Sequence, residues 1–447
     1  MRADYPMNTQ EIPRPQNKWK TLFALSMGYF VDQGEAQAMS VFSPVLRQIW
    51  SLSFQQLSWI TFIRSLLQAL SSPFWGYLAD RYSRKKVIFW GTGIWGAWTL
   101  VVGLTQSFGQ LLAVRVISGI GLGCLMPATF GIMADTFAPK VRGRMLGILE
   151  GVGITGIIVF TLGLGLLATP ELWRYGFIIL GAASIISGIL ILILVDEPVR
   201  GAAEPEMRGQ LTADAASRYQ AQWDGIREVL AIPTIRVAIV QGLAGSMPWV
   251  IMGAFFILWL VEKRGLSTQE APLVFGAILV GTVISNIVGG VLGDWAEKKS
   301  PKYGRTIIGQ VSVIAGIPLT WYLLTQTDNW SLMQIALLCF FTALFISWPG
   351  KGSKEPMMQG VVPPELRSTA FAATTFIENG FAAIVALIFG IIADKLDLQV
   401  AMVWTIPVPW ILCAILYSGF YFTYPRDSAK LRAEMARRAE ELGITAE

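Results

Sequence analysis

The stretch GYLADRYSRKK at residues 76–86 ends one long apolar stretch of the chain and begins the next. A related stretch, GVLGD at residues 290–294, is also followed by basic residues, and its Asp lies 214 positions after the Asp of the first. A second pair has the same relation, since PKVR at residues 139–142 resembles PELR at residues 364–367. Similarity at such spacing indicates an internal repeat. The sequence therefore predicts two related halves.

Twelve apolar stretches surround these motifs, six before and six after a charged segment near the middle of the chain. Each reaches about 20 residues, the length that a helix needs to cross the hydrocarbon core of a bilayer. We predict an all-α membrane protein with twelve transmembrane helices in two six-helix bundles. The helices are expected at residues 19–46, 54–80, 86–106, 110–135, 143–168, 173–195, 234–261, 271–294, 305–325, 330–358, 368–393 and 400–423.

The composition excludes several classes of protein. Of the 447 residues, 53% are hydrophobic and 15% are charged, whereas soluble domains carry about 25% charged residues. The chain has no His, and its 3 Cys lie inside apolar stretches, which excludes imidazole metal sites and nucleophiles activated by His. It also lacks a phosphate-binding Walker loop. We therefore predict no enzyme activity, no cofactor and no metal. The net charge of +5 sits in short basic clusters between apolar stretches, a pattern that favours a membrane over nucleic acid.

The basic residues indicate how the chain lies in the membrane. If the N-terminus is cytoplasmic, the segments on the inner side hold 28 Lys and Arg residues, and the segments on the outer side hold 5. Cytoplasmic loops carry such an excess, so we expect both termini on the cytoplasmic side of a bacterial-type inner membrane. The first apolar stretch is too long for a signal peptide and is expected to remain as an anchor. The expected parts are residues 1–195, a cytoplasmic linker at 196–233, residues 234–425 and a cytoplasmic tail at 426–447.

Charged residues inside the predicted spans are candidates for function, because a charge at the bilayer centre costs at least a few kcal/mol unless it is paired or faces water. Asp32 and Glu35 are three residues apart and share one face of the first helix. Arg64 lies at a similar depth in the second helix. A pairing of Arg64 with either acid is therefore allowed.

The remaining charges leave two interpretations open. Glu150 and Glu378 fall near mid-depth of the fifth and eleventh helices, whereas Arg115 falls in the outer third of the fourth. A static ion-pair network could lock the helices together. Alternatively, the surplus of acids over bases in the first half leaves one carboxylate to exchange a proton. We favour the second interpretation, with Asp32 as the first candidate for this carboxylate and Glu150 as the second.

The stretch WPGKGSKEP at residues 348–356 interrupts the tenth apolar stretch. Interrupted helices at membrane depth line protein or water and often form transporter sites. Lys351 and Lys354 would offer positive charge to an anionic group there, and Glu355 could neutralise one of them. In the alternative, the helix ends at Trp348 and the remainder is a cytoplasmic loop.

Two motifs resemble signatures of the major facilitator superfamily of secondary transporters. Residues 76–86 resemble its loop signature G-x-L-a-D-R-x-G-R-[RK], with Ser83 in place of the usual Gly, and RVISGIG at 115–121 resembles R-x-x-x-G-x-G. YFVD at residues 29–32, the stretch at 76–86 and RGR at 142–144 are also similar to Spinster-like lipid transporters and to bacterial solute permeases. The Gly-Pro pair that is typical of drug antiporters is absent from residues 147–165.

This resemblance implies a gate on the inner side. Asp80 would approach the positive N-terminal end of the eleventh helix near Arg367. Arg81 and Arg84 are also explained by the excess of positive charge expected on the inner side. The gating residues implied are Gly76, Asp80, Arg81, Arg84, Asp294 and Arg367.

We therefore expect a secondary active transporter that works by alternating access as a symporter or antiporter, driven by protons or by sodium. The expected substrate is a small organic anion or an amphipathic solute, and the expected form in the lipid bilayer is a monomer. One alternative is an exporter of lysolipids, sphingolipid-like lipids or hydrophobic drugs. Another is a membrane receptor or sensor that transports nothing.

Overall fold

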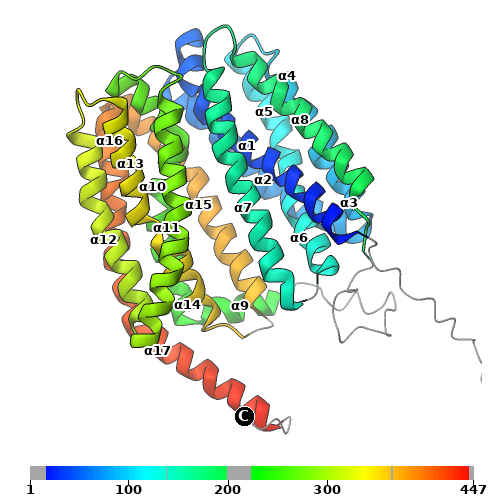
Figure 1. Ribbon diagram of the computed structural model, residues 1–447, viewed down its shortest axis with the longest axis vertical. Coiled ribbons are helices and arrows are strands. Elements are labelled where there is room, and N and C mark those ends of the chain that lie inside the picture. Colours follow the sequence, from blue (N-terminus) through cyan, green and yellow to red (C-terminus); the bar gives the residue numbers. More distant parts are fainter. Residues whose placement is uncertain (1–16, 138, 199–222, 364–365, 442–447) are drawn as a thin grey trace, which may run out of the picture.

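The computed structural model describes residues 17–137, 139–198, 223–363 and 366–441, and these residues contain helices and no strand. Figure 1 shows long helices side by side, with the C-terminal helix extending beyond the others. The helices form twelve segments, in agreement with the predicted spans.

The first six segments comprise nine helical elements. Segments one and two are α1 (Lys18–Trp50) and α2 (Phe54–Arg81), and segment three consists of α3 (Arg84–Ile88), the π-helix η1 (Phe89–Ile94) and α4 (Ala97–Val102). Segment four consists of α5 (Phe108–Leu122) and α6 (Leu125–Thr136), and segments five and six are α7 (Pro139–Leu166) and α8 (Trp173–Leu194).

A short helix, α9 (Trp223–Ala231), precedes the other six segments. Segments seven to nine are α10 (Pro233–Arg264), α11 (Ala271–Lys299) and α12 (Gly304–Thr325). Segment ten consists of α13 (Leu332–Ile346), the π-helix η4 (Gly350–Lys354) and α14 (Glu355–Gln359). Segment eleven is α15 (Arg367–Leu396), and segment twelve consists of α16 (Leu398–Thr405) and α17 (Pro407–Glu441).

Because successive segments alternate in direction, the connections gather on two sides of the molecule. We call the side with residues 82–83, 195–198 and 300–303 the terminal side, since α1 begins and α17 ends there. The distal side carries residues 51–53, 167–172 and 265–270.

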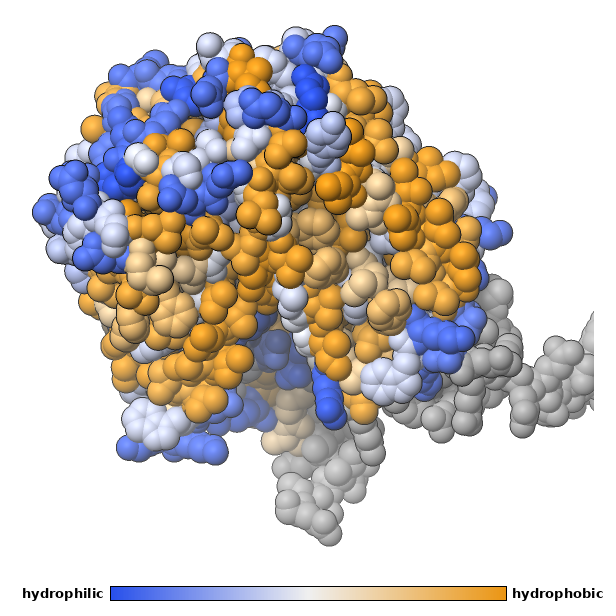
Figure 2. Space-filling model, turned by 45° about the horizontal axis from the view of Figure 1, so that its top comes forward, coloured by the Kyte–Doolittle hydropathy of each residue, from blue (hydrophilic) through white to orange (hydrophobic). Residues whose placement is uncertain are grey.

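Eight helices of the described chain are long and apolar enough to cross a membrane, and they belong to segments five to twelve. The first two segments carry more polar residues, and the third and fourth are divided into shorter helices. Figure 2 shows apolar side chains covering the sides of the helices, with hydrophilic residues gathered toward the ends. This distribution suits a molecule surrounded by lipid.

The two sets of six segments repeat the same packing. In the first set α1 packs on α7 and α8, and α2 packs on α5. In the second set α10 packs on α15 and α17, and α11 packs on α13, which are the corresponding pairs six segments later. Across the two sets, α2 contacts α15, α1 contacts α10, and α7 contacts α11. The central site lies where these sets meet.

The tenth segment does not end at Trp348, so the alternative interpretation of this stretch is wrong. The chain continues through η4 and α14, and residues 332–359 count as one candidate span. A π-turn keeps the backbone helical through the Gly-rich part. Gly352 is needed there because a Cβ atom at this position would collide with the backbone of Gly289 in α11.

The twelfth segment continues directly into the predicted tail. α17 remains helical to Glu441, past Pro425. Asp427 fixes it to α10, because its Oδ2 accepts hydrogen bonds from the backbone N–H and the hydroxyl of Thr234, at 2.8 and 2.6 Å.

Candidate functional site

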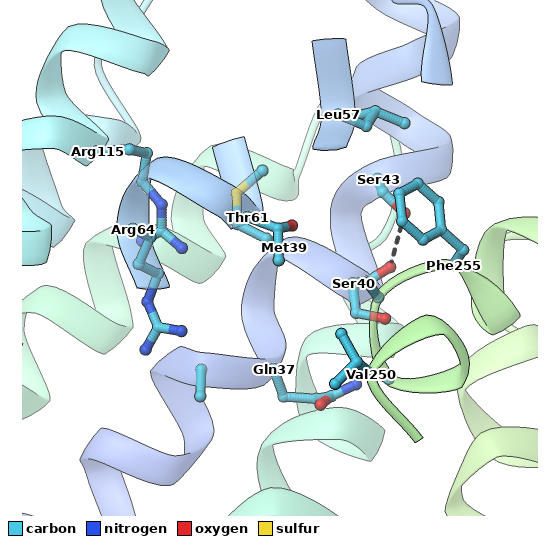
Figure 3. Close-up of a pocket in the computed structure, with 13 residues that line it drawn as sticks. Gln37, Met39, Ser40, Ser43, Leu57, Thr61, Arg64, Arg115, Val250 and Phe255 are labelled. Atoms are coloured by element: carbon cyan, nitrogen blue, oxygen red, sulfur yellow. Dashed lines mark hydrogen bonds between the residues drawn. The ribbon is translucent and has the colours of Figure 1, made fainter. Parts of the chain in front are cut away.

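A cavity of about 210 Å³ lies between the two sets of helices. α1, α2 and α5 form one part of its wall and α10 forms the other. In Figure 3, Arg64 and Arg115 lie together at one side of this central cavity, and Gln37, Ser40 and Ser43 lie opposite them. Its apolar wall is formed by residues that include Leu57, Val250 and Phe255.

Arg115 is fully buried and pairs with Glu35, which is 2% exposed. The distance between Arg115 Nη1 and Glu35 Oε1 is 3.3 Å. Glu35 therefore pairs with Arg115, and the pairing of Glu35 with Arg64 that the sequence allowed does not form. The sequence placed Arg115 in the outer third of the fourth helix, which agrees with its position near the start of α5 at Phe108, and its side chain lines the cavity.

Several nitrogen and oxygen atoms around the cavity are buried without a hydrogen-bond partner among the described residues. They are Nε of Arg64, Nε of Arg115, Nε2 of Gln37 and Oγ of Ser40. The Arg64 guanidinium forms no hydrogen bond or ion pair in the described part of the chain. Buried polar groups are normally satisfied, so this wall offers several donors to a ligand.

Asp32 lies on α1, buried and close enough to Arg64 and Glu35 to interact with both electrostatically. Its carboxylate takes part in no hydrogen bond within the described residues. Four of the predicted residues, Asp32, Glu35, Arg64 and Arg115, are thus brought together. Glu150 is apart from them on α7, exposed, and accepts a hydrogen bond from the Tyr29 hydroxyl at 3.3 Å.

The second set of helices contributes its own polar cavity, of about 290 Å³, beside α10. Lys354 of η4 and Glu378 of α15 line it and form an ion pair. Gly242 leaves room for this pair, since a Cβ atom there would collide with both side chains. Lys354 is therefore a cavity residue, but its charge is already compensated.

Lys351 lies in a more exposed position. It pairs with Glu355 at 2.9 Å, and more than half of the Lys351 side chain is exposed. Glu355 and Arg367 both line a further cavity of about 610 Å³ in the second set of helices.

The signature residues on the terminal side have partners that the sequence analysis missed. Arg84 forms an ion pair with Asp135, and its backbone N–H donates to Glu197 at 2.5 Å. Asp294 pairs with Arg305 at 2.6 Å.

Three other residues of the predicted gate lie on the same side. Arg81 donates to the Tyr77 hydroxyl at 2.9 Å. Gly76 has open space where a side chain would begin, and Arg367 begins α15. The side chain of Asp80 lies outside the described side chains.

The distal side is closed by contacts between the two sets of helices. Asp394 at the end of α15 accepts hydrogen bonds from the backbone N–H groups of Phe54 and Gln55 at the start of α2, both at 2.8 Å. Arg47 pairs with Glu262 at 2.5 Å. Within the described residues, every hydrogen bond between α1–α8 and α10–α17 lies on this side.

A sequence signal for Asp394 exists. GIIADK at residues 390–395 resembles GYLADR at residues 76–81. GYLADR ends α2 on the terminal side, whereas GIIADK lies near the end of α15 on the distal side. Nearby, the Lys263 ammonium hydrogen-bonds Asp397 at 2.5 Å and holds the pKa of that carboxyl below its ordinary value.

Comparison with known proteins agrees with this architecture. The family model described as "Major Facilitator Superfamily" matches residues 25–386. The "Cis,cis-muconate transport protein" of Acinetobacter baylyi is 22% identical over 419 residues, which cover 92% of this chain and 97% of that protein. The "Probable galactarate/D-glucarate transporter GudP" of Escherichia coli (strain K12) is 23% identical over 293 residues, 60% of this chain and 64% of that protein.

Among solved structures, a bacterial homologue of the human lysosomal transporter Spinster, crystallised in an inward-facing and occupied conformation, has a TM-score of 0.77. It is 20% identical, and the match covers 91% of this chain and 97% of that one. The fold is thus the twelve-helix fold of membrane transporters, which are not enzymes. With its family model matched over residues 25–386, this chain is an integral membrane protein that belongs to the major facilitator superfamily.

Proposed function

We propose that this protein carries a small organic anion together with a proton across the bacterial inner membrane. One observation carries the proposal: two guanidinium groups, of Arg64 and Arg115, meet in a central cavity, and each has a buried Nε without a partner in the described part of the chain. Two like charges at one place repel each other unless an anion lies between them. The planar guanidinium group suits a carboxylate, which it can bind through two parallel hydrogen bonds.

The dimensions of the cavity support a small substrate. Its volume of about 210 Å³ is below the range of roughly 300–1,000 Å³ of sites for drug-sized ligands. Val250 and Phe255 would contact the carbon skeleton while Gln37 and Ser40 bind polar groups. The relatives named for galactarate, D-glucarate and cis,cis-muconate point in the same direction, since all three are dicarboxylates.

The position of Asp32 supports coupling to protons. An ionised Asp32 compensates the charge of Arg64, the cationic group with which it interacts electrostatically. When Asp32 takes up a proton, Arg64 is left with uncompensated charge, and an anion binds more strongly. Proton and anion therefore favour each other's binding, which is the condition for symport.

The closed distal side supports alternating access between two six-helix halves, residues 1–195 and 234–425. In the opposite conformation the contacts of Asp394 and of Arg47 with Glu262 would open, and the terminal side would close near Arg367. The excess of basic residues on the terminal side supports a cytoplasmic position for that side and for both termini. We infer that the protein works as a monomer.

Binding of dicarboxylates to Arg64 tests the substrate class. Purified protein is titrated with galactarate, D-glucarate and cis,cis-muconate, and binding is followed by the rise in thermal unfolding temperature. We expect Arg64→Gln to lower the affinity for the anion tenfold or more. Arg437→Gln, which removes a charge from the exposed tail, should bind the anion as wild type does.

Two results would contradict the proposed substrate class. One is equal binding by wild type and Arg64→Gln. The other is stabilisation by lysophosphatidylcholine with no response to any of the three anions, which would instead support the lipid exporter.

A further inference from the structure

A second, much smaller cavity lies inside the first set of helices, next to α1. It has about 10 Å³ of space for the centre of a water molecule, which is room for roughly one water. It is enclosed by α1, the third segment, α5 and α8. The polar residues that line it are Asp32, Glu35, Thr92, Thr99, Ser118 and Ser184.

Two hydroxyl groups in this small cavity have no hydrogen-bond partner among the residues that the structure describes. Thr92 and Thr99 are 7% and 1% exposed, and neither Oγ1 atom forms a hydrogen bond within the described residues. Leaving buried hydroxyls unpaired costs free energy. Among the other polar groups of the cavity, Ser118 donates to the backbone of Arg115 and Trp95 donates to Ile117. The Ser184 hydroxyl forms no hydrogen bond within the described residues.

The two carboxylates complete the set of groups. Asp32 forms no hydrogen bond in the described chain, and Glu35 forms one, with Arg115. A water molecule can accept two hydrogen bonds and donate two. One water here would accept from Thr92 and Thr99 and donate to Asp32 and Glu35, so it would satisfy all four side chains.

We propose that this small cavity binds one water molecule, which passes the transported proton between Asp32 and Glu35. The proton transfer, unlike the binding of the water, rests on the proposed function. In it, protonated Asp32 replaces one of the two threonine hydroxyls as a donor to the water and gives its proton to the water, while the water gives another of its protons to the Glu35 carboxylate. The water is regenerated, Asp32 becomes ionised, and Glu35 becomes neutral.

This transfer connects the small cavity with the central one. Arg115 loses its counter-charge when Glu35 becomes neutral, so its guanidinium becomes available to the substrate anion. Arg64 then faces the ionised Asp32.

The other groups that act on Asp32 are Tyr29 on its own helix and Cys124 between α5 and α6. A sodium ion fits the small cavity less well than water. It would lie among the same carboxylates but also near the guanidinium groups of Arg64 and Arg115, which repel it.

The first test is a crystal structure of the wild-type protein at a resolution that shows ordered water. We expect one water within hydrogen-bond distance of both Thr92 Oγ1 and Thr99 Oγ1, and no such water in Thr92→Val/Thr99→Val. A dry cavity in the wild type, or a sodium ion there, would overturn the proposal.

The second test compares proton flux with exchange of cis,cis-muconate in proteoliposomes. In Thr92→Val/Thr99→Val we expect the protons moved per anion to fall at least tenfold, while anion exchange at equal pH stays within twofold of wild type. Thr92→Ser/Thr99→Ser keeps both hydroxyls and is expected to retain coupling. Thr161→Val removes a buried, unpartnered hydroxyl from α7 outside both cavities and should behave as wild type.

The outcomes separate the two proposals. If wild type moves protons and the double Val variant moves them equally, the role of the water is wrong although proton coupling stands. If wild type moves the anion without protons, coupling itself is wrong, and the presence of the water is still decided by the crystal structure.

Discussion

At the scale of single residues, Glu35 and Arg115 form the most buried ion pair of the described chain. Taking two charges out of water costs several kcal/mol, which their attraction offsets only while both are present. Removing one partner leaves the other buried and charged, at a cost of about 3–5 kcal/mol. Here the cost is increased by Arg64, whose charge lies near that of Arg115.

We therefore expect Glu35→Gln to lower the thermal unfolding temperature of the purified protein substantially. Glu35→Gln/Arg115→Gln should recover part of the loss, because neither charge remains unpaired. Glu434→Gln, at the exposed pair with Arg437, serves as the control and should change stability by less than about 1 kcal/mol. A Glu35→Gln protein as stable as this control would show that the pair contributes little.

The sequence identified the charged residues of the site but not their pairing. A charge within an apolar stretch stands out by composition alone, which is how Asp32, Glu35, Arg64 and Arg115 were found. Depth along a helix says nothing of how the helix is rotated or where its neighbours lie. For that reason Arg115 was not expected as the partner of Glu35. Gln37 and Ser40 were missed because polar uncharged residues are common in such helices.

At the scale of helices, the contact of Asp394 with the start of α2 explains the closed distal side. The first backbone N–H groups of a helix have no partner within the helix, and they carry partial positive charge. The Asp394 carboxylate accepts from two of them and so joins α15 to α2. Ser53 and Gln56 form a capping box at the same helix start.

We expect Asp394→Asn to weaken this contact and open the distal side more often. The measurement is the labelling rate of Thr61→Cys, which lines the central cavity, by a membrane-impermeant thiol reagent applied from the distal side. The natural Cys residues are buried. We expect the rate to rise severalfold in the Asp394→Asn background.

Asp328→Asn is the matched control. Asp328 also lies on the distal side, but it pairs with Arg264 within the second set of helices, at 2.8 Å. Labelling should stay unchanged in this variant. An equal increase in both variants, or none in Asp394→Asn, would mean that Asp394 does not hold the two sets together.

The sequence predicted the helices better than their interruptions. Apolar stretches of about 20 residues are a strong signal, and all twelve segments lie where these stretches do. The π-helix η1 was not expected. An interruption was expected at residues 348–356, where η4 lies, but its π-helical form was not, because that form depends on packing between neighbouring helices. At η4, the close approach of Gly352 to Gly289 is a tertiary contact that the local sequence does not specify.

At the scale of the whole molecule, two similar motifs lie on opposite sides. GYLADR at 76–81 is on the terminal side and GIIADK at 390–395 is on the distal side. In this conformation the distal motif joins the two sets of helices through Asp394. The conformation could not be predicted from the sequence, since under the proposed alternating access one sequence permits both the distal-closed and the distal-open arrangement with only a few kcal/mol between them.

The most direct measurement is simultaneous uptake of cis,cis-muconate and protons into proteoliposomes that contain wild type or Asp32→Asn. The proposed coupling predicts that wild type takes up both together, and that an inwardly directed proton gradient drives anion accumulation. Asp32→Asn should still exchange anion at equal pH, but it should neither accumulate anion nor move protons. Anion uptake by wild type without protons, or proton-driven accumulation by Asp32→Asn equal to that of wild type, would contradict it.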